Sequence, residues 1–342
     1  MYSHFSNYQI DSIVSCVPSD KQRNTALPFD ENTIKKVSKS SGIKSRRIAD
    51  NDTTASDLCM RAAEHLLESK KIDNKGIGVL IFVTQYPDYI LPSTAHIIKE
   101  RLGLPQSTIS IQINEGCSGY IYGLQMCLSL MESAKCDLGM LLAGDTTSKV
   151  IEDKDSGTRP IFGDAGSATL IEKGKGEIKI KLGSDGSGYN DIIIKEGGFR
   201  HSTTNNRPPS SVNRPPSLTM NGMNVFMFGI SRIPKYIKEF CNDTNTDITN
   251  IDYLVLHQAN KMMNSRIVRK LGVEEEKALY SLEEFGNTSS ASIPLTMTHN
   301  LKEKKEKSKF LVCGFGVGLS WGTATFELDN QCFLDTIEYL KP

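Results

Sequence analysis

The sequence has no long apolar run, no excess of either charge and no paired cysteine motif. Its longest apolar stretch, around residues 79–83, is far too short to span a bilayer, and residues 1–24 do not combine a basic start with an apolar segment. Lys plus Arg equals Asp plus Glu, at 40 each, so nothing favours nucleic-acid binding or attraction to a membrane surface. We expect a soluble, cytoplasmic protein whose contacts with charged partners are local.

The eight cysteines form no C-x-x-C pair, and no group of Cys and His residues has the spacing of a zinc site. A chain of 342 residues can bury a large core without covalent cross-links. Reduced thiols are therefore expected, and most of these cysteines should be small core residues. The length alone suggests two domains or one duplicated domain.

The two halves of the sequence resemble each other. Apolar strands alternate with amphipathic helical stretches, which is typical of a layered α/β protein. The apolar strands at 140–144 and 310–314 are each followed, in the same order, by a Gly-x-Ala-Thr segment. This repetition predicts a duplicated α/β unit, with an N-terminal half at 1–173 and a C-terminal half at 174–342.

Two segments depart from this regular pattern. Residues 197–219 contain two Pro-Pro pairs, which exclude a helix or a central strand and predict a long loop across the surface or the subunit contact. Residues 302–309 are mostly charged, and we expect them to form a solvated helix end.

Cys117 stands in the sequence Gly-Cys-Ser-Gly, after the apolar strand predicted at 109–113. The apolar residues that follow recur at helical spacing, which places the sulfur at or near the first turn of a buried helix. The unpaired N–H groups and the positive dipole end there favour thiolate over thiol, the form that attacks a thioester. The alternative is an ordinary buried structural cysteine. The flanking glycines, which suit a sharp turn, count against it.

His257 and Asn287 offer an imidazole and a carboxamide that the same chemistry can use. His257 ends the apolar strand at 253–256, and the carboxyl end of a strand is where α/β proteins place their ligands. A neutral imidazole there can donate a hydrogen bond to a thioester carbonyl or take part in proton transfer. Asn287 alone could be a helix cap. Paired with His257, its amide supplies the second donor that holds a developing enolate oxygen.

A glycine-rich segment at 314–322 follows another apolar strand. It lacks the Gly-Lys-Ser/Thr of a phosphate loop, and no acidic residue follows at the spacing of a dinucleotide site. A loop that offers backbone N–H groups to an oxyanion is the better interpretation.

These segments, in this order, resemble the β-ketoacyl-acyl-carrier-protein synthase III family of the thiolase superfamily. The resemblance covers nearly the whole chain, in segments 41–48, 87–94, 114–120, 162–166, 220–222, 257–260, 286–288 and 314–322. It implies a thiolase-like fold of duplicated αβαβα layers, a homodimer, and no metal or redox cofactor. Degradative thiolases exchange the His and Asn positions and chain-elongating synthases use two histidines, so the Cys-His-Asn set is typical of the initiating type.

The resemblance also implies ping-pong chemistry on acyl and malonyl thioesters. Cys117 would take the acyl group, and His257 with Asn287 would stabilise the enolate formed when malonyl-acyl-carrier protein loses carbon dioxide. The partner would then be an acyl-carrier protein. The N–H of Cys117 and a backbone loop would form the oxyanion hole, and Phe315 would shield the decarboxylating group. That loop consists of Phe315, Gly316, Val317 and Gly318.

The chain departs from the family pattern at positions that grip coenzyme A or dock the carrier protein. Where many members have an aromatic residue or a cation, this chain has Lys36, Ser40, Ser156, Met227 and Met262. Arg269 and Lys270 remain as candidate docking residues, and Arg159 could replace a lost cation. These differences predict that an acyl group is accepted more efficiently from a carrier protein than from coenzyme A.

Glu115 lies two residues before the proposed nucleophile, where relatives usually have a small residue. It is either a base in the pocket or a structural anchor, and we favour the anchor because ion-pair networks perturb carboxylates as readily as mechanism does.

Two other functions stay open at this point. One is an acyltransferase that uses Cys117 but passes the acyl group to an amine or hydroxyl in secondary-metabolite or polysaccharide biosynthesis. The other is a non-catalytic scaffold, although such a subunit would be expected to have lost the cysteine. The sequence does not fix the acyl chain length, the pathway or the acceptor.

Overall fold

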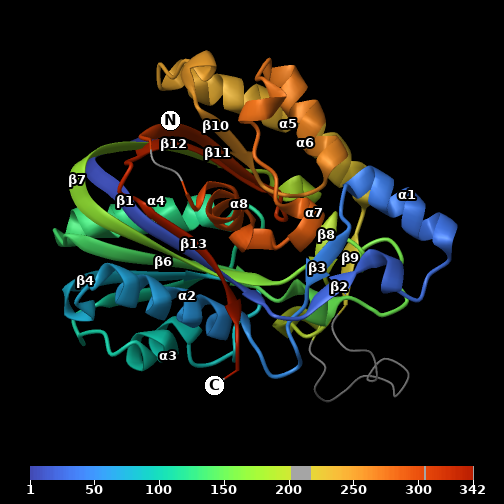
Figure 1. Cartoon of the computed structure of the whole chain (residues 1–342), viewed down its shortest axis with the longest axis horizontal. Coiled ribbons are helices and arrows are strands. Elements are labelled where there is room, and N and C mark those ends of the chain that lie inside the picture. The colour runs from blue at the N-terminus through green and yellow to red at the C-terminus, as the bar shows by residue number, and fades with distance from the viewer. Residues whose placement is uncertain (202–216, 304–305, 342) are drawn as a thin grey trace.

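The computed structural model describes residues 1–201, 217–303 and 306–341, and it has the layered α/β architecture expected from the sequence (Figure 1). Two buried helices, α4 (Gly119–Ala134) and α8 (Ser292–Leu301), form the middle layer between strands on either side. Helices α2 (Ala55–Lys70) and α3 (Thr94–Arg101) cover one outer face. The opposite face is covered by α5 (Gly222–Asp243) and α6 (Lys261–Leu271). The layers therefore follow the order αβαβα.

Nine of the described strands form one hydrogen-bonded network. Its path runs through β10 (Tyr253–Leu256), β11 (Ser308–Gly316), β12 (Ser320–Leu328), β7 (Ala165–Ser184), β6 (Leu138–Asp145), β4 (Ile77–Val83) and β5 (Ile109–Ile113). Off this path, β1 (Ser3–Pro18) pairs with both β7 and β13 (Phe333–Tyr339). Short strand pairs and helices complete the fold: β2 (Lys21–Arg23) with β3 (Ser45–Arg47), β8 (Ile192–Ile194) with β9 (Leu218–Met220), α1 (Glu31–Ser41) and α7 (Leu282–Phe285).

The long strand β7 connects the two strand layers. Its residues 165–172 pair with β6, and its residues 179–184 pair with β12. The change of partner falls next to residue 173, where the sequence suggested that one half ends and the other begins. We therefore keep 1–173 and 174–342 as the proposed halves, joined through one continuous strand.

Helix α4 is buried because its apolar side chains lie between both strand layers. The positions expected to follow the helical spacing, Tyr120, Ile121, Leu124, Leu128 and Met131, are all 0% exposed. A Cβ atom added at Gly123 would come within 2.5 Å of a Leu141 methyl group on β6. The glycine thus lets the helix approach the strand closely.

The segment that follows β10 is held by a helix cap. The Asn260 side chain accepts a hydrogen bond from the Met263 N–H at 2.8 Å and so caps α6. The helix ends at Leu271, and the next residue, Gly272, has a φ of 74° and takes the left-handed conformation that terminates helices. The short segment between β10 and α6 is therefore held by the Asn260 cap at one end and, at the other, by the His257 N–H, which donates to the Cys313 carbonyl at 2.8 Å.

The two irregular segments differ in part from expectation. The loop predicted at 197–219 lies mostly outside the described residues, and its end is different, because Leu218 and Thr219 belong to β9. In the charged run at 302–309, α8 ends at Leu301, just before the run, and β11 begins at Ser308 because strand pairing to β12 takes over there. Residues 304–305 lie outside the described part. Among the described helices, none is both long and apolar enough to cross a membrane.

Candidate active site

A cavity of about 240 Å³ opens at the start of α4, where loops from both halves meet. Cys117, His257 and Asn287, which are far apart in the sequence, all line it. Three members of the glycine-rich loop, Phe315, Gly316 and Val317, line it as well, whereas Gly318 does not. The structure therefore brings together the three side chains that the sequence singled out and most of the predicted loop.

Cys117 lies in the turn between β5 and α4, two residues before the helix begins. Ser118 is the N-cap residue, and the Gly119 N–H donates to the Gly116 carbonyl at 2.7 Å. A Cβ atom at Gly316 would lie only 2.8 Å from the Cys117 sulfur. The end of β11 thus packs its bare backbone directly against the thiol, which explains why a glycine stands there.

The preference for thiolate expected from the helix start is not found at Cys117. Burial, together with the charge of the buried Asp145 carboxylate, raises the pKa of its thiol from 9.0 to about 12. The Val317 N–H and the Ser289 hydroxyl act in the opposite direction because they donate to the sulfur. In the empty cavity the thiol is therefore the resting form, and these donors are ready to stabilise negative charge that develops on it.

His257 follows the last residue of β10, and two contacts fix it. Its Nδ1 lies 2.7 Å from the Ser292 hydroxyl, and its backbone carbonyl accepts from the Asn264 amide at 3.0 Å. The ring meets Phe315 edge-on, with centroids 5.7 Å apart. Burial lowers the pKa of His257 from 6.5 to about 3. The imidazole is therefore neutral near pH 7 and acts as a hydrogen-bonding group without adding charge.

Asn287 is held so that its amide faces the cavity with a defined orientation. Its backbone N–H donates to the Ile161 carbonyl at 2.9 Å, and its carbonyl accepts from the Gly163 N–H at 3.0 Å. The side-chain Oδ1 accepts from the Ser289 N–H at 2.9 Å. The Asn287 side chain thus does cap the following turn, but only its oxygen takes part. Its NH₂ group remains as the donor for a ligand in the cavity.

The cavity also lacks ionised groups. Among its described lining residues there is no Asp, Glu, Lys or Arg. Its walls are largely apolar and carry a thiol, a neutral imidazole and amide groups. Such a site can stabilise a transient oxyanion through hydrogen bonds, which are stronger where water is excluded.

Known proteins with the same arrangement identify the family. Models for 3-oxoacyl-acyl-carrier-protein synthase III and for its C-terminal part match residues 111–186 and 241–328. The chain is 33% identical to a putative 3-oxoacyl-acyl-carrier-protein synthase 3 of Campylobacter jejuni, over 100% of this chain and 99% of that protein. It is 34% identical to a β-ketoacyl-acyl-carrier-protein synthase III of Clostridium acetobutylicum, over 84% of this chain and 88% of the relative. This chain belongs to the 3-oxoacyl-acyl-carrier-protein synthase III family.

A solved structure supports the same family. The 3-oxoacyl-acyl-carrier-protein synthase of Burkholderia xenovorans LB400 matches with a TM-score of 0.93 and 34% identity over 99% of each chain. The thiolase-like α/β fold and an acyl-transferring enzyme of the synthase III type, both expected from the sequence, are therefore confirmed.

Sequence reasoning missed one buried residue behind the site, whose charge acts on Cys117. Asp145, at the end of β6, is fully buried and accepts hydrogen bonds from the Gln85 N–H at 2.8 Å and from the Ser290 N–H and hydroxyl at 3.0 and 2.6 Å. It therefore ties the loop after β4 to the turn before α8. An acidic residue at the carboxyl end of an apolar strand was the available signal.

The contacts of Glu115 fit the structural-anchor interpretation. Its carboxylate accepts from the Ser320 hydroxyl at 3.1 Å and lies 3.4 Å from the Ser118 hydroxyl, and those two hydroxyls are 2.6 Å apart. It is not among the residues that line the Cys117 cavity. Glu115 thus links the start of α4 to β12.

The remaining candidates lie away from the thiol. Arg269 and Lys270 occupy the last turn of α6 and are exposed, and the Lys270 ammonium donates to the Ile230 carbonyl at 2.8 Å. Arg159 pairs with Asp153 at 2.9 Å and lines a different cavity. Its use as a substitute cation at the thioester cavity therefore stays a prediction.

The depressed pKa of His257 predicts an acid-sensitive fold. Below pH 6.5 the unfolded chain binds a proton at this residue and the folded chain does not until about pH 3. Stability from this site is therefore lost as pH falls through that window, by up to about 1.4 kcal/mol per unit. Asp164, whose pKa burial raises from 3.8 to about 6, acts oppositely between those values.

We expect His257→Gln to remove only the part of the pH dependence that comes from His257. As pH falls from 6.5 to 4.5, the free energy of unfolding in urea should therefore fall less steeply for the variant than for the wild-type protein. His4→Gln, at an exposed histidine, is the control and should follow wild type. Parallel curves for His257→Gln and wild type would contradict a neutral buried imidazole.

Proposed function

We propose that this chain is a β-ketoacyl-acyl-carrier-protein synthase III that acylates Cys117 and condenses the acyl group with a malonyl unit. The observation that carries the proposal is the convergence of Cys117, His257 and Asn287 on one uncharged cavity. Each of these groups suits one step of a decarboxylative Claisen condensation.

In the first half-reaction the Cys117 sulfur attacks the carbonyl carbon of an acyl thioester. The bond to the donor sulfur breaks, the acyl group stays on Cys117, and the thiol proton ends on the departing donor thiol. The Val317 N–H, which already donates toward the sulfur, and the Cys117 N–H are the donors proposed for the oxyanion of the tetrahedral intermediate. The raised pKa of the thiol means that deprotonation accompanies substrate binding.

In the second half-reaction the malonyl thioester loses carbon dioxide and leaves an enolate. The Asn287 NH₂ group and the His257 imidazole donate hydrogen bonds to its oxygen, and its carbon attacks the acyl group on Cys117. A carbon–carbon bond forms, the thioester bond to Cys117 breaks, and the Cys117 sulfur leaves as a thiolate that takes a proton from solvent water to return to the thiol. A neutral His257 fits this role because a cation would hold the malonyl carboxylate in place rather than favour its loss.

The acyltransferase alternative uses the same cysteine with a different acceptor. It requires no enolate donors, so the orientation of Asn287 by Ser289 and of His257 by Ser292 favours condensation. A scaffold would need neither group. The two experiments below separate all three functions.

Cys117→Ala should abolish both acylation and condensation. Cys117 is the cysteine among the described residues that lines the cavity, whereas Cys127 and Cys313 are 0% exposed in the core. Intact mass after incubation with an acyl thioester should show one added acyl group on wild type and none on the variant. Cys127→Ala is the matched control and should acylate normally. An acyl group that persists in Cys117→Ala would overturn the assignment.

Asn287→Ala should separate the two half-reactions. Acylation at Cys117 should continue, while decarboxylation of the malonyl thioester should fall by about a hundredfold or more, the usual cost of one lost oxyanion donor. Release of labelled carbon dioxide measures the second step. A variant that decarboxylates at the wild-type rate would remove Asn287 from this role. If the wild-type protein acylates but never decarboxylates, the acyltransferase function replaces ours.

The edge of the sheet supports a homodimer. Strand β5 ends the sheet path, and its Ile109 and Ile111 are each 36% exposed. Nearby apolar side chains Tyr89, Ile90 and Leu91 are 61%, 72% and 84% exposed. An edge strand flanked by exposed apolar groups favours association with a second copy. Sedimentation velocity at micromolar concentration tests this proposal, and a monomer would contradict it.

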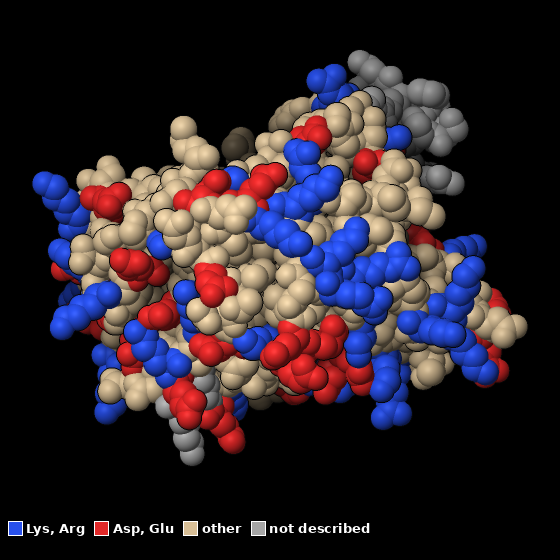
Figure 2. All heavy atoms as spheres, turned by 90° about the horizontal axis from the view of Figure 1, so that it is seen from above, with Lys and Arg blue, Asp and Glu red and all other residues tan. Residues whose placement is uncertain are grey.

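Cations on the face formed by α5 and α6 support docking of an acidic carrier protein. Figure 2 shows Lys and Arg side chains gathered across this face. Arg269 and Lys270 are exposed there at the end of α6. Met262, 41% exposed at the start of the same helix, offers no charge. We therefore expect the carrier protein to be attracted to the end of α6, away from Met262 at the start of that helix.

Reversing both charges, as Arg269→Glu with Lys270→Glu, should raise KM for an acyl-carrier-protein donor by roughly tenfold, since charge pairs at a rim govern association. Because salt screens charge pairs, added salt should raise the KM of the wild-type protein for the carrier-borne donor toward that of the variant. Acylation by a coenzyme A thioester should change little. Lys75→Glu, an exposed lysine before β4, is the control. An unchanged KM for the carrier-borne donor would place docking elsewhere.

A further inference from the structure

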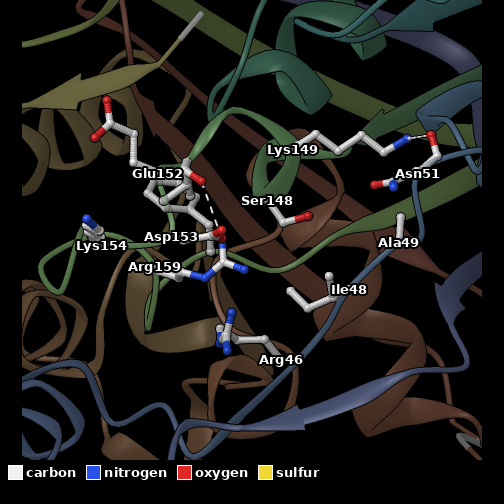
Figure 3. Close-up of a pocket in the computed structure, with 12 residues that line it drawn as sticks. Arg46, Ile48, Ala49, Asn51, Ser148, Lys149, Glu152, Asp153, Lys154 and Arg159 are labelled. Carbon is white, nitrogen blue, oxygen red and sulfur yellow. Dashed lines mark hydrogen bonds and ion pairs between the residues drawn. The ribbon is translucent and has the colours of Figure 1, made fainter. Parts of the chain in front are cut away.

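A second cavity of about 500 Å³ lies beside the thioester cavity, and Phe162 lines both. The chain after β3 forms one wall of this second cavity, and the segment that follows β6 forms the other (Figure 3). Its charged lining consists of the cations Arg46, Lys149, Lys154 and Arg159 and the carboxylates Glu152 and Asp153. Unlike its neighbour, this cavity therefore has a positive excess.

Arg46 is a buried cation that forms no ion pair within the part of the chain that the structure describes. Its side chain is 2% exposed, and its Nε donates to the Asn24 Oδ1 at 2.8 Å. Its Nη2 has no hydrogen-bond partner among the described residues. Burial, together with the nearby Arg159, lowers the pKa of Arg46 to about 10, although the carboxylates of Asp164 and Asp20 act in the opposite direction. A buried guanidinium with an unused donor is costly unless an anion or another acceptor meets it.

Arg159 faces the same space as Arg46, as Figure 3 shows. Its Nη1 donates to the Ile151 carbonyl at 3.3 Å and pairs with the Asp153 carboxylate at 2.9 Å. The Asp153 side chain is 85% exposed, so this pair can open at little cost. A carboxylate of the chain itself thus already occupies part of the place that an external oxyanion would take.

The buried carboxylate of Asp164 favours the Arg46 cation through its charge but does not pair with it. Asp164 is fully buried, and it accepts from the Ala49 N–H at 2.7 Å and from the Ser148 N–H and hydroxyl at 3.0 and 2.5 Å. It makes no ion pair with Arg46 within the described residues. The guanidinium of Arg46 therefore stays available to a ligand.

We propose that the Arg46–Arg159 cavity binds a phosphate group. Guanidinium groups form paired hydrogen bonds with phosphate oxygens, and a dianion suits a cavity that two guanidinium groups face and two further lysines line. A single carboxylate would leave more of this charge unmatched. The phosphate comes either from free inorganic phosphate or from the nucleotide end of coenzyme A, whose acyl group would enter the neighbouring cavity. Only the second source rests on the proposed function.

Calorimetric titration of the full chain with inorganic phosphate, at fixed ionic strength, tests the site without turnover. Wild type should bind saturably, and Arg159→Gln should weaken binding by at least about tenfold. Asp153→Asn should tighten binding several-fold, because it removes the competing carboxylate. Arg101→Gln is the matched control, since Arg101 also pairs with an aspartate, Asp57, at 3.2 Å. It should bind as wild type does.

Coenzyme A and dephospho-coenzyme A, which lacks the 3′-phosphate, distinguish the two sources. If the nucleotide end is the source, coenzyme A should bind more tightly than the dephospho form, and Arg159→Gln should abolish the difference. If free phosphate is the source, both forms should bind equally and phosphate should still bind in their presence. Absence of saturable phosphate binding together with equal binding of both nucleotides would overturn the proposal. So would acetate binding as tightly as phosphate. Cys117→Ala should leave phosphate binding unchanged, so failure of the condensation mechanism stays separate from failure of this site.

Discussion

The buried Asp145 carboxylate is the interaction on which the geometry of the site depends. It accepts hydrogen bonds from the loop after β4, through Gln85, and from the turn before α8, through Ser290. A buried carboxylate that lost these donors would cost several kcal/mol, so the two halves cannot slide against each other here. Ser290 also packs against the start of α4, where a Cβ atom at Gly119 would lie 3.4 Å from its own Cβ. Asp145 thus fixes the positions of the Cys117 thiol and the Asn287 amide relative to each other.

The absence of charge from the described lining of the thioester cavity explains the protonation states within it. The same burial that raises the pKa of Cys117 to about 12 lowers that of His257 to about 3, because a low dielectric disfavours every ionised form. The resting site is therefore neutral. Negative charge appears only transiently during reaction, and there the preorganised N–H donors are worth most, because no water competes with them.

Much of the fold and of the candidate site could be predicted from the sequence because both depend on local patterns. Helical spacing after Cys117 gave the buried helix, and His257 at a strand end and Asn287 before a helix gave the other two groups. The protonation of Cys117 could not be predicted, since it depends on burial by distant segments rather than on the nearby helix start. Asp145 was missed for the same reason, because its partners, Gln85 and Ser290, are 60 and 145 positions away.

In this arrangement the cationic side chains lie apart from the reacting groups. Decarboxylation needs an uncharged pocket, so cations that recognise an anionic donor must lie outside it. The cations that we propose for this purpose lie at the end of α6 and in the cavity behind Phe162. Family positions that usually carry cations are Ser40, Ser156 and Met262 here, and none of them lines the thioester cavity. We therefore expect their loss to alter which donor is captured while the reacting groups keep their surroundings. Donor choice and condensation can then change independently in this fold, because different side chains control them.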